Sequence, residues 1–135
     1  MTLRDDLIAE EGRKPSAYQD SLGFWTIGVG HLIDDRKGGS LPDAIIDALL
    51  DHDIAEHRAQ VARELPWVMS RSQACQDALT NMCFQLGLGG LLGFKSMLAA
   101  LQAGDYDGAK AHALDSTWAR QTPNRAARVV EGFVP

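Results

Sequence analysis

Glu11 has the residue type and the position of a group that could donate a proton in catalysis. At about 100° per residue, it falls near the middle of the apolar face of a predicted N-terminal helix, so it points where core residues would point. It also stands at the C-terminal end of that helix, where the negative end of the helix dipole disfavours a carboxylate. Burial and the dipole both raise a carboxyl pKa, so we expect Glu11 to titrate above an ordinary glutamate, as a general acid must. Taken alone, a glutamate at a frayed helix end that pairs with an arginine is the simpler interpretation.

Asp20 and Thr26 follow Glu11 closely and add two further groups that could take part in chemistry. Each is ordinary alone, because aspartate is common at the first position of a turn and threonine is common in strands. Together with Glu11 they place an acid on a hairpin and a hydroxyl on the returning strand, next to an acid that faces inward. Cleavage of a glycosidic bond by glycosidases needs one protonated carboxyl and a second, ionised one. The segment 11–26 could supply both from two walls of a cleft.

The elements that would position these groups follow from the spacing of apolar residues. A first helix is predicted over 2–11, because it opens with a Thr-x-x-Asp cap signal and stops before Gly12. Strand-forming residues over 16–32, interrupted by a turn sequence at 20–23, predict a β-hairpin with room for a third short strand. Apolar residues three or four positions apart predict one long amphipathic helix over about 42–65, with His57 on its apolar stripe.

The second half of the chain has the pattern of helices throughout. A helix is expected to begin at Ser72 and to end at a glycine-rich bend over 87–93. Shorter helices should follow at about 94–102, 106–114 and 122–131. The expected fold is therefore α+β and mainly α, a single domain over 1–135. Its lobes should cover about 12–40 and 66–135, with the long helix joining them.

Composition and charge exclude several classes of function. The 135 residues are 45% hydrophobic and 23% charged, which is typical of one globular domain. The net charge of −5 argues against nucleic-acid binding, because phosphate neutralisation supplies most of that affinity. No apolar run approaches the roughly 20 residues that span a bilayer, so we expect no membrane span. The acidic start of the sequence does not have the pattern of a signal peptide, so we expect a protein that stays in the cytosol.

The cysteines and histidines give no sign of a disulfide or a metal. Cys75 and Cys83 fall in one predicted helix and would lie about 12 Å apart, which is too far for a disulfide. We expect both to be small buried residues rather than reactive thiols. The 4 histidines show no spacing typical of a zinc motif, so we expect neither a metal nor another cofactor.

With these residues in view, the chain resembles the phage-type lysozymes, the endolysin muramidases of glycoside hydrolase family 24. The spacing Glu11-x8-Asp20-x5-Thr26 matches the catalytic signature of that family. The other matching segments come in the same order as in the family and cover most of the chain: Gly12, 18–19, 24–32, 81–87, 93–94 and 118–126.

The resemblance implies a lysozyme-like fold and hydrolysis of the β-1,4 bond between N-acetylmuramic acid and N-acetylglucosamine in peptidoglycan. Glu11 matches the general acid of the family. Asp20 matches the second carboxylate, which assists the attacking water or stabilises positive charge on the sugar. Thr26 matches the hydroxyl that holds this water. The family inverts the anomeric configuration, which fits carboxylates far enough apart to admit a water molecule.

The resemblance also assigns supporting positions outside the catalytic segment. Leu32 and Phe84 match substrate-contacting positions, although Leu32 could simply close the sheet and Phe84 could belong to the core. Arg125 matches an arginine that pairs with the catalytic glutamate, and this pairing would oppose the expected rise in the pKa of that glutamate. Met97 and His112 stand where better-known members place polar residues along the cleft.

Two other functions fit the same residues. A lytic transglycosylase would cut the same bond with one acid–base group and no water, and a noncatalytic module that binds the wall could keep the fold. The resemblance favours an endolysin that acts as a monomer on peptidoglycan glycan strands and lyses the host cell. Such a protein would wait in the host cytoplasm and reach the wall through a lesion made by a separate holin.

Overall fold

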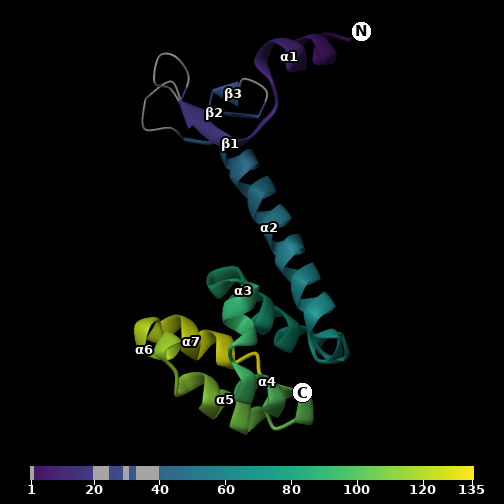
Figure 1. The fold of residues 1–135 in the computed structure, drawn as a ribbon. Coiled ribbons are helices and arrows are strands. Elements are labelled where there is room, and N and C mark those ends of the chain that lie inside the picture. Colours follow the sequence, from purple (N-terminus) through teal and green to yellow (C-terminus); the bar gives the residue numbers. More distant parts are fainter. Residues whose placement is uncertain (1, 20–24, 29–30, 33–39) are drawn as a thin grey trace. The chain divides into compact units, whose positions relative to one another are not determined.

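The computed structural model describes residues 2–19, 25–28, 31–32 and 40–135 (Figure 1). Asp20 and the turn predicted at 20–23 lie outside the described residues. The chain divides into two compact units, Met1–Leu49 and Leu50–Pro135, and each is taken by itself below.

The first helix of the N-terminal unit, α1, covers Leu3–Glu11 and begins at the cap that the sequence predicts. The hydroxyl of Thr2 accepts a hydrogen bond from the backbone N–H of Asp5 (3.1 Å), and the Asp5 carboxylate accepts from the backbone N–H of Thr2 (3.1 Å). The two bonds that the Asp5 carboxylate accepts, from the backbone N–H and from the hydroxyl of Thr2, keep the pKa of Asp5 below its ordinary value. The helix ends at Gly12, whose φ of 74° suits glycine and whose N–H donates to the carbonyl of Ile8.

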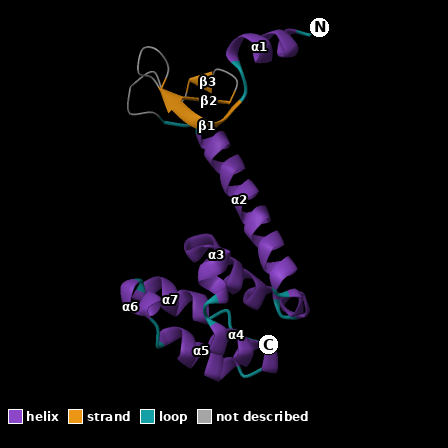
Figure 2. Ribbon diagram, in the orientation of Figure 1, coloured by secondary structure: helices purple, strands orange, loops and turns teal. Residues whose placement is uncertain are grey.

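A three-stranded antiparallel sheet follows α1, with its strands shown in orange in Figure 2. Its strands are β1 (Lys14–Gln19), β2 (Trp25–Gly28) and β3 (His31–Leu32), in the order β1-β2-β3. The third strand that the sequence left room for is therefore present. In the central strand β2, Thr26 is the Cα partner of Tyr18 on β1 and of Leu32 on β3.

The long helix α2 covers Asp43–Glu64, within two residues of the predicted range. Its first residues belong to the N-terminal unit and the remainder to the Leu50–Pro135 unit. A short 3-10 helix, Pro66–Ser70, comes directly after it and was not predicted. Proline at its first position fixes φ and needs no hydrogen-bonding partner for an N–H group.

The Leu50–Pro135 unit is helical, as expected. Its helices after α2 are α3 (Gln73–Leu92), α4 (Lys95–Ala103), α5 (Tyr106–Leu114), α6 (Thr117–Gln121) and α7 (Pro123–Val130). The predicted bend at 87–93 is wrong in extent, because only Gly87 leaves helical geometry (φ 75°, ψ 167°) and the chain is helical again up to Leu92. The prediction also missed α6, a single short turn of helix capped by the Ser116 hydroxyl.

The described residues thus confirm a mainly helical α+β fold with seven α-helices and a small sheet near the N-terminus. Within this part of the chain, no single helix is both long and apolar enough to cross a membrane, although α3 and α4 together, bent by 100°, meet that test on length and composition.

The core of the Leu50–Pro135 unit is built mainly from aliphatic side chains, with the aromatic rings of Trp118 and Phe133. The largest fully buried side chains are Phe133, Leu79, Met82, Leu91, Met97, Leu101, Val68, Cys75 and Cys83. Both cysteines are free and fully buried, so the prediction of small buried residues without a disulfide is confirmed. Helix–helix packing in this unit therefore depends on interlocking aliphatic volume.

Burial of the cysteines predicts a loss of stability at alkaline pH. Desolvation raises the pKa of Cys75 and of Cys83 above the ordinary value of 9.0, and the cation of Arg71 opposes the shift at Cys75 only in part. A thiol whose pKa is raised by folding stabilises the folded state below its unfolded pKa, and this contribution is lost as the pH rises through that range. We expect the free energy of unfolding to fall above about pH 9, by at most about 1.4 kcal/mol per pH unit for each thiol.

Urea unfolding of the wild-type protein and of Cys75→Ala at several alkaline pH values measures this contribution. The variant should lose stability less steeply with pH than the wild type, whatever its stability at neutral pH. Equal slopes in the two proteins would show that the thiol does not titrate differently in the folded and unfolded chains.

Candidate active site

The predicted catalytic residues come from the first helix and the sheet of the N-terminal unit. Glu11 is the last residue of α1, and Thr26 is in the central strand β2. Thr26 is only 5% exposed, which is uncommon for a polar side chain in so small a sheet. Asp20 lies outside the described residues, and nothing is described of the Glu11 side chain. The structure thus places Glu11 at the end of α1 and Thr26 in the central strand of the sheet.

Leu32 is brought next to Thr26 by strand pairing. The two residues are Cα partners across β2 and β3. The register therefore places the backbone of the predicted substrate contact Leu32 opposite that of the predicted water-holding residue Thr26.

Phe84 belongs to α3 in the other unit and is 41% exposed, so it is not a core residue. The sequence had left both possibilities open. Its ring contacts the imidazole of His57 on α2, with ring centroids 5.2 Å apart and planes at 55°. The predicted substrate contact Phe84 is therefore an accessible aromatic ring with one described aromatic neighbour.

Arg125 of α7 is held by Asn81 of α3. Its Nε and Nη2 atoms both donate to Asn81 Oδ1, at 3.0 Å and 2.9 Å, and Nη2 also approaches the Asn81 carbonyl oxygen at 3.4 Å. Because two N–H groups of the Arg125 guanidinium donate to the same amide oxygen, the direction of the planar guanidinium is fixed. Asn81 was not singled out as a functional residue in the sequence, because a contact between positions so far apart in the chain leaves no local pattern.

Two hollows adjoin Arg125 and Asn81 in the Leu50–Pro135 unit. The larger, of about 480 Å³, includes Asp77 and Arg128 in its lining. The smaller, of about 270 Å³, has a more apolar wall that includes Phe84. Asp77 and Arg125 line both hollows, with Arg128 in the larger one and Arg58 in the smaller one, and Asp77 is paired with Arg58 at 2.8 Å.

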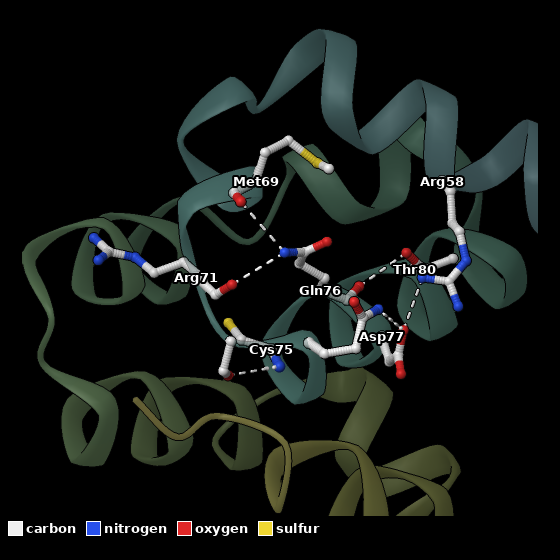
Figure 3. A network of polar contacts seen from close by, with 9 residues as sticks. Arg58, Met69, Arg71, Cys75, Gln76, Asp77 and Thr80 are labelled. Atoms are coloured by element: carbon white, nitrogen blue, oxygen red, sulfur yellow. Dashed lines mark hydrogen bonds and ion pairs between the residues drawn. The ribbon is translucent and has the colours of Figure 1, made fainter.

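A network of polar contacts at the start of α3 positions the helix that carries Asn81 and Phe84 (Figure 3). Arg58 Nη1 on α2 and Gln73 Nε2 both donate to Asp77 Oδ1, at 2.8 Å and 2.9 Å. Gln76 Nε2 donates to the carbonyl of Arg71 (3.0 Å), and the Thr80 hydroxyl donates to the carbonyl of Gln76 (2.8 Å). These contacts link α3 to α2 and to the turn that precedes it.

Trp118 and its neighbours form a second fixed group on this unit. Trp118 Nε1 donates to Gln85 Oε1 at 2.9 Å, and its ring meets Phe94 edge to face with centroids 5.8 Å apart. Both partners lie in segments that carried the resemblance. Nearby, Met97 and His112 line a hollow of about 470 Å³, but Met97 is only 1% exposed whereas His112 is exposed.

One group of side chains on α2 has the composition of a metal site. His52, Asp53 and Glu56 each bring one ligand atom within 4.8 Å of the others. His52 Nε2 and Glu56 Oε2 are 3.6 Å apart at an i, i+4 spacing, and both side chains are largely exposed. This arrangement is typical of an ion pair on a solvated helix face, so we assign no metal to it.

Comparisons with known proteins cover almost the whole chain. A family profile described as Phage lysozyme matches residues 9–135. Probable T4-type lysozyme 1 of Dictyostelium discoideum is 28% identical over 156 aligned positions, which cover 96% of this chain and 91% of that protein. The Endolysin of Acyrthosiphon pisum secondary endosymbiont phage 1 is 27% identical over 124 positions, which cover 92% of this chain and 82% of that protein.

The Pre-baseplate central spike protein Gp5 of Enterobacteria phage T4 is also similar, at 30% identity over 154 positions. The alignment covers 96% of this chain but only 27% of the spike protein. This chain therefore corresponds to one part of that larger relative and to most of the lysozyme and endolysin relatives.

Proposed function

This chain belongs to the phage lysozyme family, and we propose that it hydrolyses the β-1,4 bond between N-acetylmuramic acid and N-acetylglucosamine in peptidoglycan. The family is one of peptidoglycan-degrading glycoside hydrolases, and relatives bear the names lysozyme and endolysin. The observation that carries the proposal is the match over residues 9–135, which includes Glu11, Asp20 and Thr26. The secondary structure supports it, because Glu11 ends a helix and Thr26 occupies the central strand.

In the proposed reaction, Glu11 donates its proton to the glycosidic oxygen as the bond from that oxygen to C1 breaks. A water molecule held by the Thr26 hydroxyl attacks C1 from the opposite face, and its proton passes to Asp20 or to solvent. The carboxylate of Asp20 also stabilises positive charge that develops on the sugar ring. Because water enters opposite the leaving group, the anomeric configuration inverts.

The supporting residues have separate proposed roles. Leu32 and Phe84 contact the glycan, and the exposed ring of Phe84 suits an apolar sugar face. Arg125 supplies a positive charge to the site, and its bonds to Asn81 fix the direction in which the guanidinium points. No step of this mechanism requires a cofactor.

We also propose that the protein lyses its host cell as a monomeric endolysin. It would be held in the host cytoplasm and reach the wall through a membrane lesion made by a separate holin. The similarity to an endolysin of a phage supports this role. Production in bacteria with and without a holin tests it, since lysis should require both proteins, and lysis without the holin would contradict the proposed route.

Purified sacculi and proton NMR test the proposed reaction. The wild-type protein should release soluble fragments, and the first product seen at the new reducing ends should be the α-anomer, because a β-bond is inverted. A β-anomer as first product would contradict the proposed stereochemistry. Absence of released fragments would favour a noncatalytic wall-binding module.

A further inference from the structure

We propose that His57 is a positioning residue, which holds the ring of Phe84 in the orientation that contacts the glycan. This inference rests on the proposed function, and it concerns a residue to which the resemblance assigned no role. His57 is a half-buried residue of α2, whereas Phe84 is an exposed residue of α3. The contact between their rings therefore joins two helices at the proposed substrate contact.

The imidazole of His57 also contacts a buried thiol. His57 Nδ1 lies 3.5 Å from Cys83 Sγ, and Cys83 Sγ lies 3.5 Å from Gln60 Oε1. With hydrogen on Nδ1, the imidazole donates to the sulfur while the S–H group donates to the Gln60 amide oxygen. Cys83 is fully buried, so its sulfur provides a fixed point for the ring.

The residue that holds His57, Cys83, is the direct neighbour of Phe84 in the chain. Cys83 and Phe84 are consecutive residues of α3, one buried and one 41% exposed. An exposed phenylalanine on a helix has more than one accessible rotamer. The tilted contact with His57, at 5.2 Å between centroids, favours one of them.

His57 is separate from the described lining of the hollow beside Phe84. Phe84, Leu50 and Ile54 are among the residues that line the hollow of about 270 Å³, and His57 is not among the described residues of that lining. A change at His57 therefore alters the proposed binding surface through Phe84. His57 itself need not touch the glycan.

Steady-state kinetics on solubilised peptidoglycan test the proposal. His57→Ala should raise KM by about two- to tenfold, which corresponds to loss of one aromatic contact, and should leave kcat within about twofold. His57→Phe keeps a ring against Phe84 and should restore most of the wild-type KM. His52→Ala, at an exposed histidine of the same helix, is the matched control and should change neither constant.

A double-mutant cycle separates positioning from a purely structural role. If His57 acts through Phe84, His57→Ala should add nothing to the KM of Phe84→Ala, and thermal melting should show that each variant is folded. Additive effects on KM, or an unchanged KM in an active His57→Ala enzyme, would overturn the inference and leave the proposed function intact. A wild-type protein that releases no fragments would instead overturn the proposed function itself.

Discussion

Glu11→Gln should slow the release of soluble fragments from peptidoglycan by about 100- to 10,000-fold, which is the usual contribution of a general acid. Glutamine has nearly the size and shape of glutamic acid, but its amide cannot transfer a proton to the leaving oxygen. Glu11 ends α1 and is followed by Gly12, which closes the helix, so the substitution leaves the helix and its cap unchanged. The loss should therefore appear in the rate, and the melting temperature should not fall.

Glu10→Gln is the matched control for this prediction. Glu10 is the preceding residue of α1, is exposed, and carries the same side chain. Its substitution should leave the rate within about twofold of wild type, since a solvated carboxylate away from the reacting bond contributes little. A Glu11→Gln protein that clears permeabilised cells at the wild-type rate would remove Glu11 from the proposed role.

Phe133→Ala should destabilise the Leu50–Pro135 unit by about 3–5 kcal/mol, the usual cost of truncating a buried aromatic side chain. Phe133 is 0% exposed although it stands close to the end of the chain. The turn around it is closely packed, because a Cβ added at Gly132 would lie only 2.7 Å from the carbonyl oxygen of Ala74 on α3. The Ser72 hydroxyl also donates to the carbonyl of Val134 at 2.8 Å. A cavity left by the ring therefore has little freedom to collapse.

Leu114→Ala is the comparison for the stability measurement. Leu114 ends α5 and is 46% exposed, so its truncation should cost under about 1 kcal/mol. Urea unfolding of both variants, followed by circular dichroism, measures the difference. A Phe133→Ala protein as stable as Leu114→Ala would show that the last residues of the chain do not contribute to the core.

The elements that sequence could predict are those with strong local signals. Thr2 with Asp5 forms a capping box, Ser72 caps α3, and Gly104 ends α4 in the left-handed conformation (φ 80°). Such signals depend on groups within a few residues of each other. The 3-10 helix Pro66–Ser70 and α6 were missed because a segment of five residues has too few positions to show a period. The extent of the bend after Gly87 was overestimated because tertiary packing can hold glycine in helical geometry.

The candidate site could be predicted in part for the same reason. Residue type, local spacing and a family resemblance single out Glu11, Asp20 and Thr26. The contacts between Arg125 and Asn81 and between His57 and Phe84 join distant parts of the chain, so no local sequence pattern predicts them. His57 did carry one signal, because it is a polar residue on the apolar stripe of the long helix. A residue that breaks a local rule in this way often has a specific partner.

Mass spectrometry of the fragments released from purified sacculi tests the central claim most directly. Hydrolysis between N-acetylmuramic acid and N-acetylglucosamine adds one water across each broken bond, so every new reducing end should be N-acetylmuramic acid and every new non-reducing end N-acetylglucosamine. Ends in 1,6-anhydro-N-acetylmuramic acid, one water lighter, would show a lytic transglycosylase and contradict the proposed hydrolysis.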